Sequence, residues 1–139
     1  MVDLPTRRDV NPLSRFNGDV EIVKTAITTK LYRDAPERHG KWERLLGGLC
    51  NLHGIAPKVL VIKQGRQYSE FNGKIILNKY SIISLLHEFG HAIGLKHQGT
   101  INCWNYSEYV YFTANPKAKE KLVKNEKRIW VKKPQGDSK

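Results

Sequence analysis

The chain has 139 residues, 40% of them hydrophobic, and a formal net charge of +11. This length predicts one domain with its own core and excludes a small disulfide-stapled scaffold. No apolar run approaches the roughly 18 residues of a membrane span, and no apolar segment follows the basic N-terminal residues, so we expect a cytoplasmic protein without a signal peptide. The two cysteines, Cys50 and Cys103, form no C-x-x-C pair, which argues against a cysteine-type zinc finger.

The N-terminal half predicts an irregular segment followed by two helices. Residues 1–18 contain two prolines and the turn signal FNGD, and we expect them to be irregular. Apolar residues recur at helical spacing over 19–32, with Asp19 as the expected N-cap. They recur again over 41–54, where Gly54 stops the second helix.

The middle of the chain predicts a small sheet and a buried helix. The β-branched run KVLVIKQ, residues 58–64, is typical of a strand. The runs QYSEF and KIILN lie on either side of Asn72-Gly73, a pair that favours a type I′ hairpin turn. From Ser81 the sequence becomes helical and apolar on nearly every side, which predicts a buried helix that stops at Gly94.

The C-terminal part predicts a last helix and a basic tail. The helix is expected from about Ser107, with a break or kink at Pro116 and continuation over 117–129. Residues 131–139 are expected to be disordered. Residues 117–139 carry a net charge of +6, which suits nucleic acid or an acidic partner but also a solvated helix face. The fold class expected from these elements is α+β, with one domain over 19–130.

The stretch HEFGHAIGLKH concentrates three of the five histidines on the predicted buried helix. His87 and His91 lie four residues apart, so one helical face can present both imidazoles to one metal ion. Glu88 lies about 100° around the helix from His87, where a general base for a metal-bound water is needed. Gly94 can take a positive φ and turn the chain, so that His97 returns as a third ligand. Three protein ligands leave one position open for water, as in catalytic zinc sites.

An alternative interpretation is that these polar residues simply lie on a solvated helix face. It fits poorly with a helix that is apolar almost all round, because buried histidines and a buried glutamate need partners. A metal ion is the simplest partner for them.

The same stretch resembles the extended zinc signature of metzincins, in particular that of the archaemetzincins. The resemblance covers only the motif and the short cysteine-containing loop after it. It implies one zinc ion per chain and a metallo-endopeptidase in which Glu88 is the general base and proton shuttle. The positions that match the signature are His87, Glu88, His91, Gly94 and His97.

The resemblance also implies a minimal zincin-like fold. Its mixed sheet, with the hairpin packed on the motif helix, would offer an edge strand to an extended protein or peptide substrate, and QYSEF and KIILN are the candidates for that edge. The resemblance does not include the methionine turn below the zinc, because the only methionine is Met1. The segment NCWNYSE offers Trp104 for the floor of the site instead.

Other residues near the motif leave alternatives open. Glu108 is an alternative to His97 as third ligand, as in gluzincins, or a partner that orients a histidine. Tyr106 is a candidate to hydrogen-bond the oxyanion, with a core or surface position as the alternative. His39 and His53 have no partner at a suitable spacing, and we expect them to be structural or exposed.

Three other functions remain compatible with the sequence. Ribonucleases of the rRNA-maturation type use the same H-x3-H-x5-H spacing but generally lack a glutamate at the position of Glu88. A protease recruited to nucleic acid by residues 117–139 is a second alternative. The third is a zinc-stabilised interaction module, whose closed site would be completed by Glu108 or Cys103. The oligomeric state is not predicted.

Overall fold

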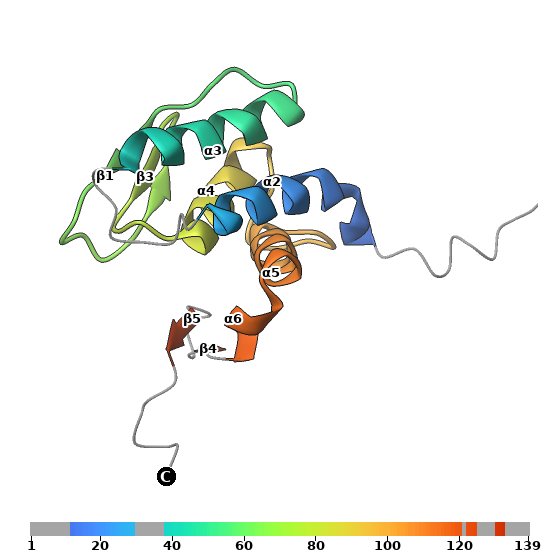
Figure 1. Ribbon diagram of the computed structural model, residues 1–139. Coiled ribbons are helices and arrows are strands. Elements are labelled where there is room, and N and C mark those ends of the chain that lie inside the picture. Colours follow the sequence, from blue (N-terminus) through green and yellow to red (C-terminus); the bar gives the residue numbers. More distant parts are fainter. Residues whose placement is uncertain (1–11, 30–37, 121, 125–129, 133–139) are drawn as a thin grey trace, which may run out of the picture.

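The structure is a computed structural model that describes residues 12–29, 38–120, 122–124 and 130–132 (Figure 1). Within this part of the chain, no helix is long and apolar enough to cross a membrane. The elements in chain order are η1 (Pro12–Phe16), α2 (Asn17–Thr28), α3 (His39–Leu52), β1 (Leu60–Ile62), β2 (Glu70–Phe71), β3 (Ile75–Leu77), α4 (Ile82–Ala92), α5 (Cys103–Ala114), α6 (Pro116–Glu120), β4 (Leu122–Lys124) and β5 (Trp130–Lys132).

The fold is α+β, as predicted, and its three-stranded sheet is mixed. The central strand β3 pairs in parallel with β1 and antiparallel with β2. The hairpin is confirmed, but its loop has three residues rather than two, because Phe71 pairs with Ile75. Gly73 has φ +88°, a conformation that a residue with a side chain rarely adopts.

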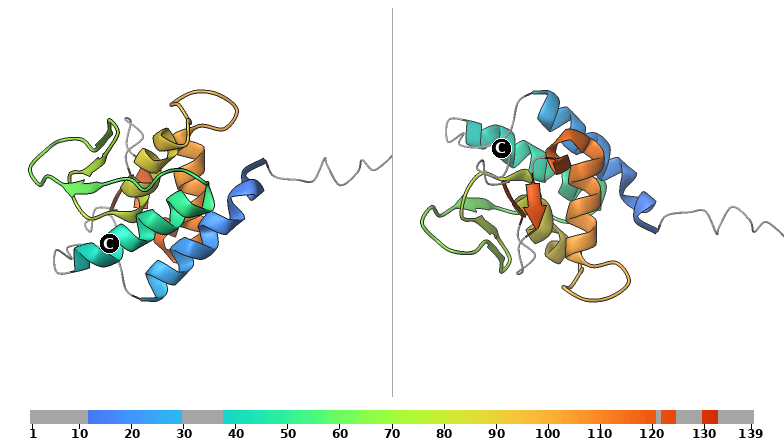
Figure 2. Two further views of the ribbon diagram at one scale, coloured as in Figure 1. Left: turned by 90° about the horizontal axis from the view of Figure 1, so that it is seen from above. Right: turned by 90° about the horizontal axis from the view of Figure 1, so that it is seen from below.

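The motif helix α4 is buried, as its sequence predicts, and it packs against α5 and against β2 and β3. Leu85, Leu86 and Phe89 are completely buried on it. The two N-terminal helices lie side by side, and α2 also packs along α5 (Figures 1 and 2). The sheet and α5 therefore hold α4 from two directions.

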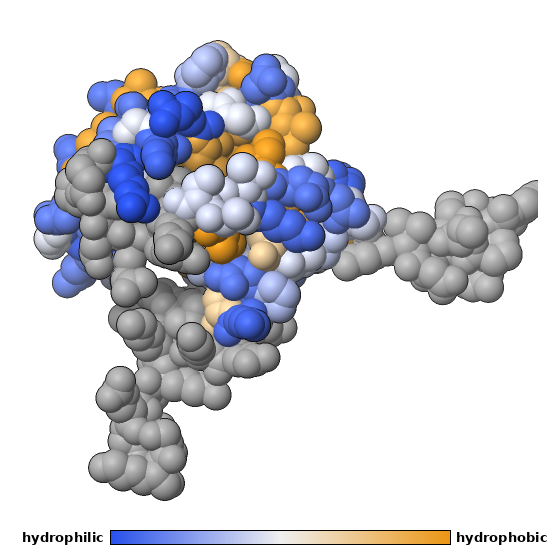
Figure 3. Space-filling model, viewed as in Figure 1, coloured by the Kyte–Doolittle hydropathy of each residue, from blue (hydrophilic) through white to orange (hydrophobic). Residues whose placement is uncertain are grey.

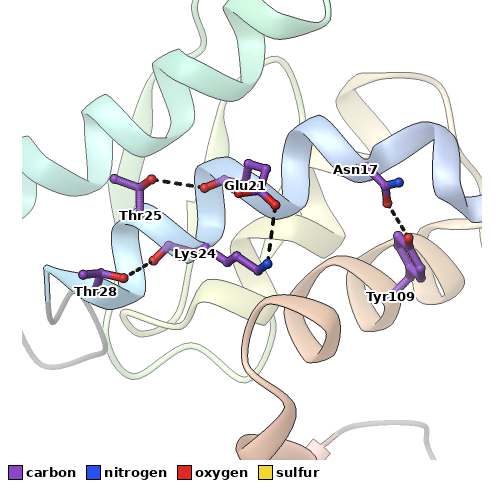
Figure 4. A network of polar contacts seen from close by, with 6 residues as sticks. All are labelled: Asn17, Glu21, Lys24, Thr25, Thr28 and Tyr109. Atoms are coloured by element: carbon purple, nitrogen blue, oxygen red, sulfur yellow. Dashed lines mark hydrogen bonds and ion pairs between the residues drawn. The ribbon is translucent and has the colours of Figure 1, made fainter.

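Polar contacts add to the packing of α2. Tyr109 of α5 donates a hydrogen bond to the Asn17 side chain at the start of α2 (Figure 4). Along the exposed side of α2, Lys24 pairs with Glu21 at 3.4 Å, and an exposed pair of this kind contributes only a few tenths of a kcal/mol, about 0.3–0.5. On the face shown in Figure 3, apolar residues form small separate groups among hydrophilic ones.

The N-terminal predictions need two corrections. Residues 12–18 are helical rather than irregular, because η1 leads directly into α2. Asp19 is not the N-cap of this helix, since α2 begins at Asn17 with Phe16 at the cap position. The Asp19 side chain is instead buried, with 1% of its surface exposed.

The C-terminal prediction is also partly wrong. Helix α5 begins at Cys103 rather than near Ser107, because Asn102 caps it in a reciprocal arrangement with Asn105. The expected helix over 117–129 ends at Glu120, and β4 pairs antiparallel with β5. Branched and aromatic residues in the two short strands favour this pairing over a helix. Apart from the end of β5, the tail expected to be disordered lies outside the described residues.

Candidate metal centre

The end of α4 brings the histidines together. The Ser81 side chain caps the start of the helix by accepting a hydrogen bond from the Ser84 amide at 3.3 Å. At the other end, Gly94 has φ +96°, and the Leu95 amide donates to the Gly90 carbonyl at 2.9 Å. The chain therefore reverses immediately after α4, as the glycine in the motif predicts. The Nε2 atoms of His91 and His97 lie 3.2 Å apart as a result.

Four side chains converge at this point. One ligand atom from each residue can be chosen so that all four lie within 4.8 Å of one another, and such a group could hold a metal ion. Its exposure ranges from the buried Cys103 to the exposed His97, so the cluster opens to solvent on one side. The residues of the group, referred to below as the metal cluster, are His87, His91, His97 and Cys103.

The hydrogen bond of His91 prepares it for a metal. Its Nδ1–H donates to the Leu95 carbonyl at 2.9 Å, because a carbonyl oxygen can only accept. This bond leaves Nε2, the nitrogen that faces the cluster, as the atom available to a metal, and a backbone carbonyl that accepts from the other ring nitrogen is typical of metal-binding histidines.

The surroundings of His87 favour its neutral ring. Burial, and then the charges of His91 and His97, lower the pKa of His87 from 6.5 to about 4. Its buried Nδ1 has no hydrogen-bond partner among the described residues. Imidazole nitrogens together with a thiol suit a transition metal rather than calcium or magnesium, which prefer oxygen ligands.

Glu88 directly follows His87 on α4 but is not part of the metal cluster. Only 7% of its surface is exposed. Burial, and secondarily the charge of Glu70, raise the pKa of Glu88 from 4.5 to about 7. Glu70 begins β2 and is held by Arg66 at 2.8 Å and by Asn72 at 2.7 Å. Strand β2 also packs against α4, the helix that carries Glu88.

Of the other predicted site residues, Trp104 lies against the metal cluster and Glu108 does not. The Trp104 ring lies against the cluster, with its centroid 4.3 Å from that of His87 and 5.9 Å from that of His97. Glu108 lies outside the metal cluster and lines a cavity of about 360 Å³ with Tyr109 and other residues of α5, η1 and α6. The geometry thus brings His97, and not Glu108, to the other two histidines.

Tyr106 belongs to a buried network that the sequence interpretation missed. Its hydroxyl donates to the Asp19 carboxylate at 2.7 Å, so it is not directed at an oxyanion. His53 Nε2 lies 2.7 Å from the same carboxylate. Burial, and then the Asp19 charge, raise the pKa of Tyr106 well above its usual value of 10. The available signal was the spacing of Asp19 from Val23 and Ala26, which puts an acid on the apolar face of its helix.

His39 is likewise part of the structure rather than of the cluster. Its Nδ1 lies 2.9 Å from the Tyr80 hydroxyl, and its Nε2 lies 3.5 Å from the Glu43 carboxylate. These contacts agree with the structural role expected for it.

Comparison with protein-family models, with curated proteins and with solved structures finds no match for this chain. A function can therefore be inferred only from the residues of the site and their chemistry.

Proposed function

We propose that this protein is a zinc-dependent metallopeptidase. The observation that carries the proposal is the buried side chain of Glu88, which directly follows His87 on the helix that also carries His91. A site that only bound a metal would gain nothing from burying this additional acid, which costs free energy when it ionises. The resemblance of HEFGHAIGLKH to the metzincin signature supports the same conclusion.

The donor set and its spacing fit zinc. A tetrahedral ion with Zn–N bonds of about 2.0–2.1 Å holds two nitrogens about 3.3 Å apart. The Nε2 atoms of His91 and His97 are 3.2 Å apart, so an ion between them requires little rearrangement. The three histidines would be the protein ligands of the active enzyme, as the resemblance implies.

The chemistry assigned to the protein falls mainly on Glu88. Zinc, when bound, supplies a Lewis acid that polarises the scissile carbonyl and acidifies a water molecule. Glu88 would accept a proton from the attacking water and deliver it to the leaving amine. A proton acceptor with a pKa near 7 is well matched to both transfers. A bound cation lowers this pKa and favours the ionised, proton-accepting form.

Strand β2 supports the binding of an extended peptide. In the sheet of described strands, β3 is central, so only β2 of the two hairpin strands offers an edge. A peptide that added to this edge would form main-chain hydrogen bonds. It would lie next to β2, the strand that packs against the helix carrying Glu88.

Glu88 also distinguishes peptide hydrolysis from the ribonuclease alternative, whose motif generally lacks this residue. The test is to load the wild type and a Glu88→Gln variant with zinc and to incubate each with a peptide mixture and with structured RNA. We expect defined peptide cuts by the wild type only, with a loss of about 10²-fold or more in the variant. Equal zinc content in both proteins is the control. RNA cleavage without peptide cleavage would support the nuclease instead.

A further inference from the structure

The mechanism above uses three histidines and Glu88, but it gives no role to Cys103. The sulfur of Cys103 lies 3.5 Å from His87 Nε2, and the residue is completely buried. It is a full member of the metal cluster, since its sulfur satisfies the same 4.8 Å limit as the histidine nitrogens. Its position therefore requires an explanation of its own.

The distance between the Cys103 sulfur and His87 Nε2 is the one expected for two ligands of the same metal ion. With Zn–S of about 2.3 Å and Zn–N of about 2.0–2.1 Å, tetrahedral geometry separates sulfur from nitrogen by about 3.6 Å. The observed separation is 3.5 Å. The histidine pair and the cysteine–histidine pair thus both have the spacing that a single tetrahedral zinc requires.

The fold holds Cys103 in this position. A Cβ atom at Gly90 of α4 would lie 3.1 Å from the Cys103 Cβ and 3.3 Å from its Cα, so only glycine permits this approach without displacement. The Cys103 amide donates to the Lys96 carbonyl at 2.9 Å, which ties the start of α5 to the residue before His97. As the first residue of α5, Cys103 also lies where the helix favours an anionic ligand.

Four protein ligands fill a tetrahedral shell and leave no position for water. Glu88 nevertheless follows His87 on α4 and is buried, which a purely structural metal site does not require. We propose that the Cys103 sulfur is the fourth ligand of the metal and keeps the peptidase latent until water or substrate displaces it. This inference rests on the proposed function, whose three-histidine site it closes in the resting state.

The test uses the full-length protein loaded with cobalt, which takes the place of zinc and has an optical spectrum. The wild type should bind one cobalt ion per chain and show the sulfur-to-cobalt charge-transfer band in the near ultraviolet. A Cys103→Ala variant, at saturating cobalt, should lose the band and keep the ion. The matched control is Cys50→Ala, because Cys50 is also buried but lies in α3, outside the metal cluster, and its variant should keep the band.

Peptide cleavage by the zinc-loaded proteins then tests latency. If the open site is a minor population of the wild type, Cys103→Ala should raise the rate by about tenfold or more, and Cys50→Ala should not. Absence of the band from wild type that holds one cobalt would overturn the ligand assignment without affecting the proposed peptidase. If the band is present but neither protein cleaves peptides, sulfur ligation stands, whereas latency and the proposed function both fail. If Cys103→Ala does not fold, the spectrum of the wild type still decides the ligand assignment.

Discussion

Replacing Glu88 by Gln should change how the stability of the metal-free protein depends on pH. Burial raises the pKa of Glu88 from 4.5 to about 7, so the folded state favours the protonated carboxyl. Between these two pH values the folded state binds more protons at this site than the unfolded state. Stability contributed by this site must therefore fall as pH rises through that window. Gln cannot ionise and removes this dependence.

The size of the effect follows from the pKa values. Moving a carboxyl pKa from 4.5 to about 7 corresponds to about 3 kcal/mol, at about 1.4 kcal/mol for each pH unit. The free energy of unfolding of the wild type should thus fall by about 3 kcal/mol relative to Glu88→Gln between pH 4 and pH 8. His87 acts in the opposite direction, because its lowered pKa costs stability as pH falls from 6.5 to about 4. That contribution is present in both proteins and cancels in their difference.

The assay is urea unfolding of both proteins in the presence of a chelator, at pH steps from 4 to 8. If the difference in free energy of unfolding between wild type and Glu88→Gln does not change with pH, Glu88 is as well hydrated in the folded state as in the unfolded chain. That result would refute its assignment as a buried acid. Repeating the series at saturating zinc should greatly reduce the pH dependence, because a cation beside the carboxylate stabilises its ionised form.

Three further predictions concern the cluster and the tail. Gly90→Ala should lower the free energy of unfolding in urea by about 1–3 kcal/mol, because the new Cβ meets the Cys103 backbone. The control is Gly47→Ala in α3, where no atom lies within 4 Å, and it should raise the free energy of unfolding by up to about 1 kcal/mol. Equal effects of the two substitutions would exclude a close approach at Gly90. His97→Asn should weaken zinc binding by more than about tenfold, measured by competition with a chromophoric chelator, and Glu108→Gln should not. Weaker zinc binding by Glu108→Gln than by His97→Asn would make Glu108 the third ligand. If residues 117–139 recruit the protein to nucleic acid, the full chain should show salt-sensitive binding in fluorescence anisotropy, and truncation after Asn115 should abolish that binding. Binding that survives the truncation would exclude the basic tail as the contact.

The sequence predicts the parts of the fold that depend on local pattern. The apolar helix of the motif and the Asn72-Gly73 hairpin depend on helical periodicity and on a residue that tolerates positive φ, and both are found. The helix expected across 117–129 is found only as far as Glu120, because the pairing of β4 with β5 is a contact between strands that helical spacing does not reveal. The three-residue loop of the hairpin was not predictable either, since the pairing of β2 with β3 sets the register.

The sequence likewise predicts only those contacts of the metal cluster that depend on local pattern. The approach of His87 and His91 follows from the spacing of residues on one helix, and that of His97 from a glycine stop. Cys103 comes from the next helix, and its contact depends on how closely α4 and α5 pack at Gly90, which spacing along the chain does not encode. The Asp19–Tyr106 hydrogen bond joins residues 87 positions apart and is a property of the tertiary structure alone.

The most direct test of the proposed metallopeptidase is cleavage of an unbiased peptide mixture, with the products read by mass spectrometry. The proteins to compare are zinc-loaded wild type and Cys103→Ala, each with and without Glu88→Gln. We predict defined cuts that are faster with Cys103→Ala and that disappear with Glu88→Gln although zinc remains bound. Unchanged turnover after Glu88→Gln, or no cuts by any protein shown to hold zinc, would contradict the proposed peptidase.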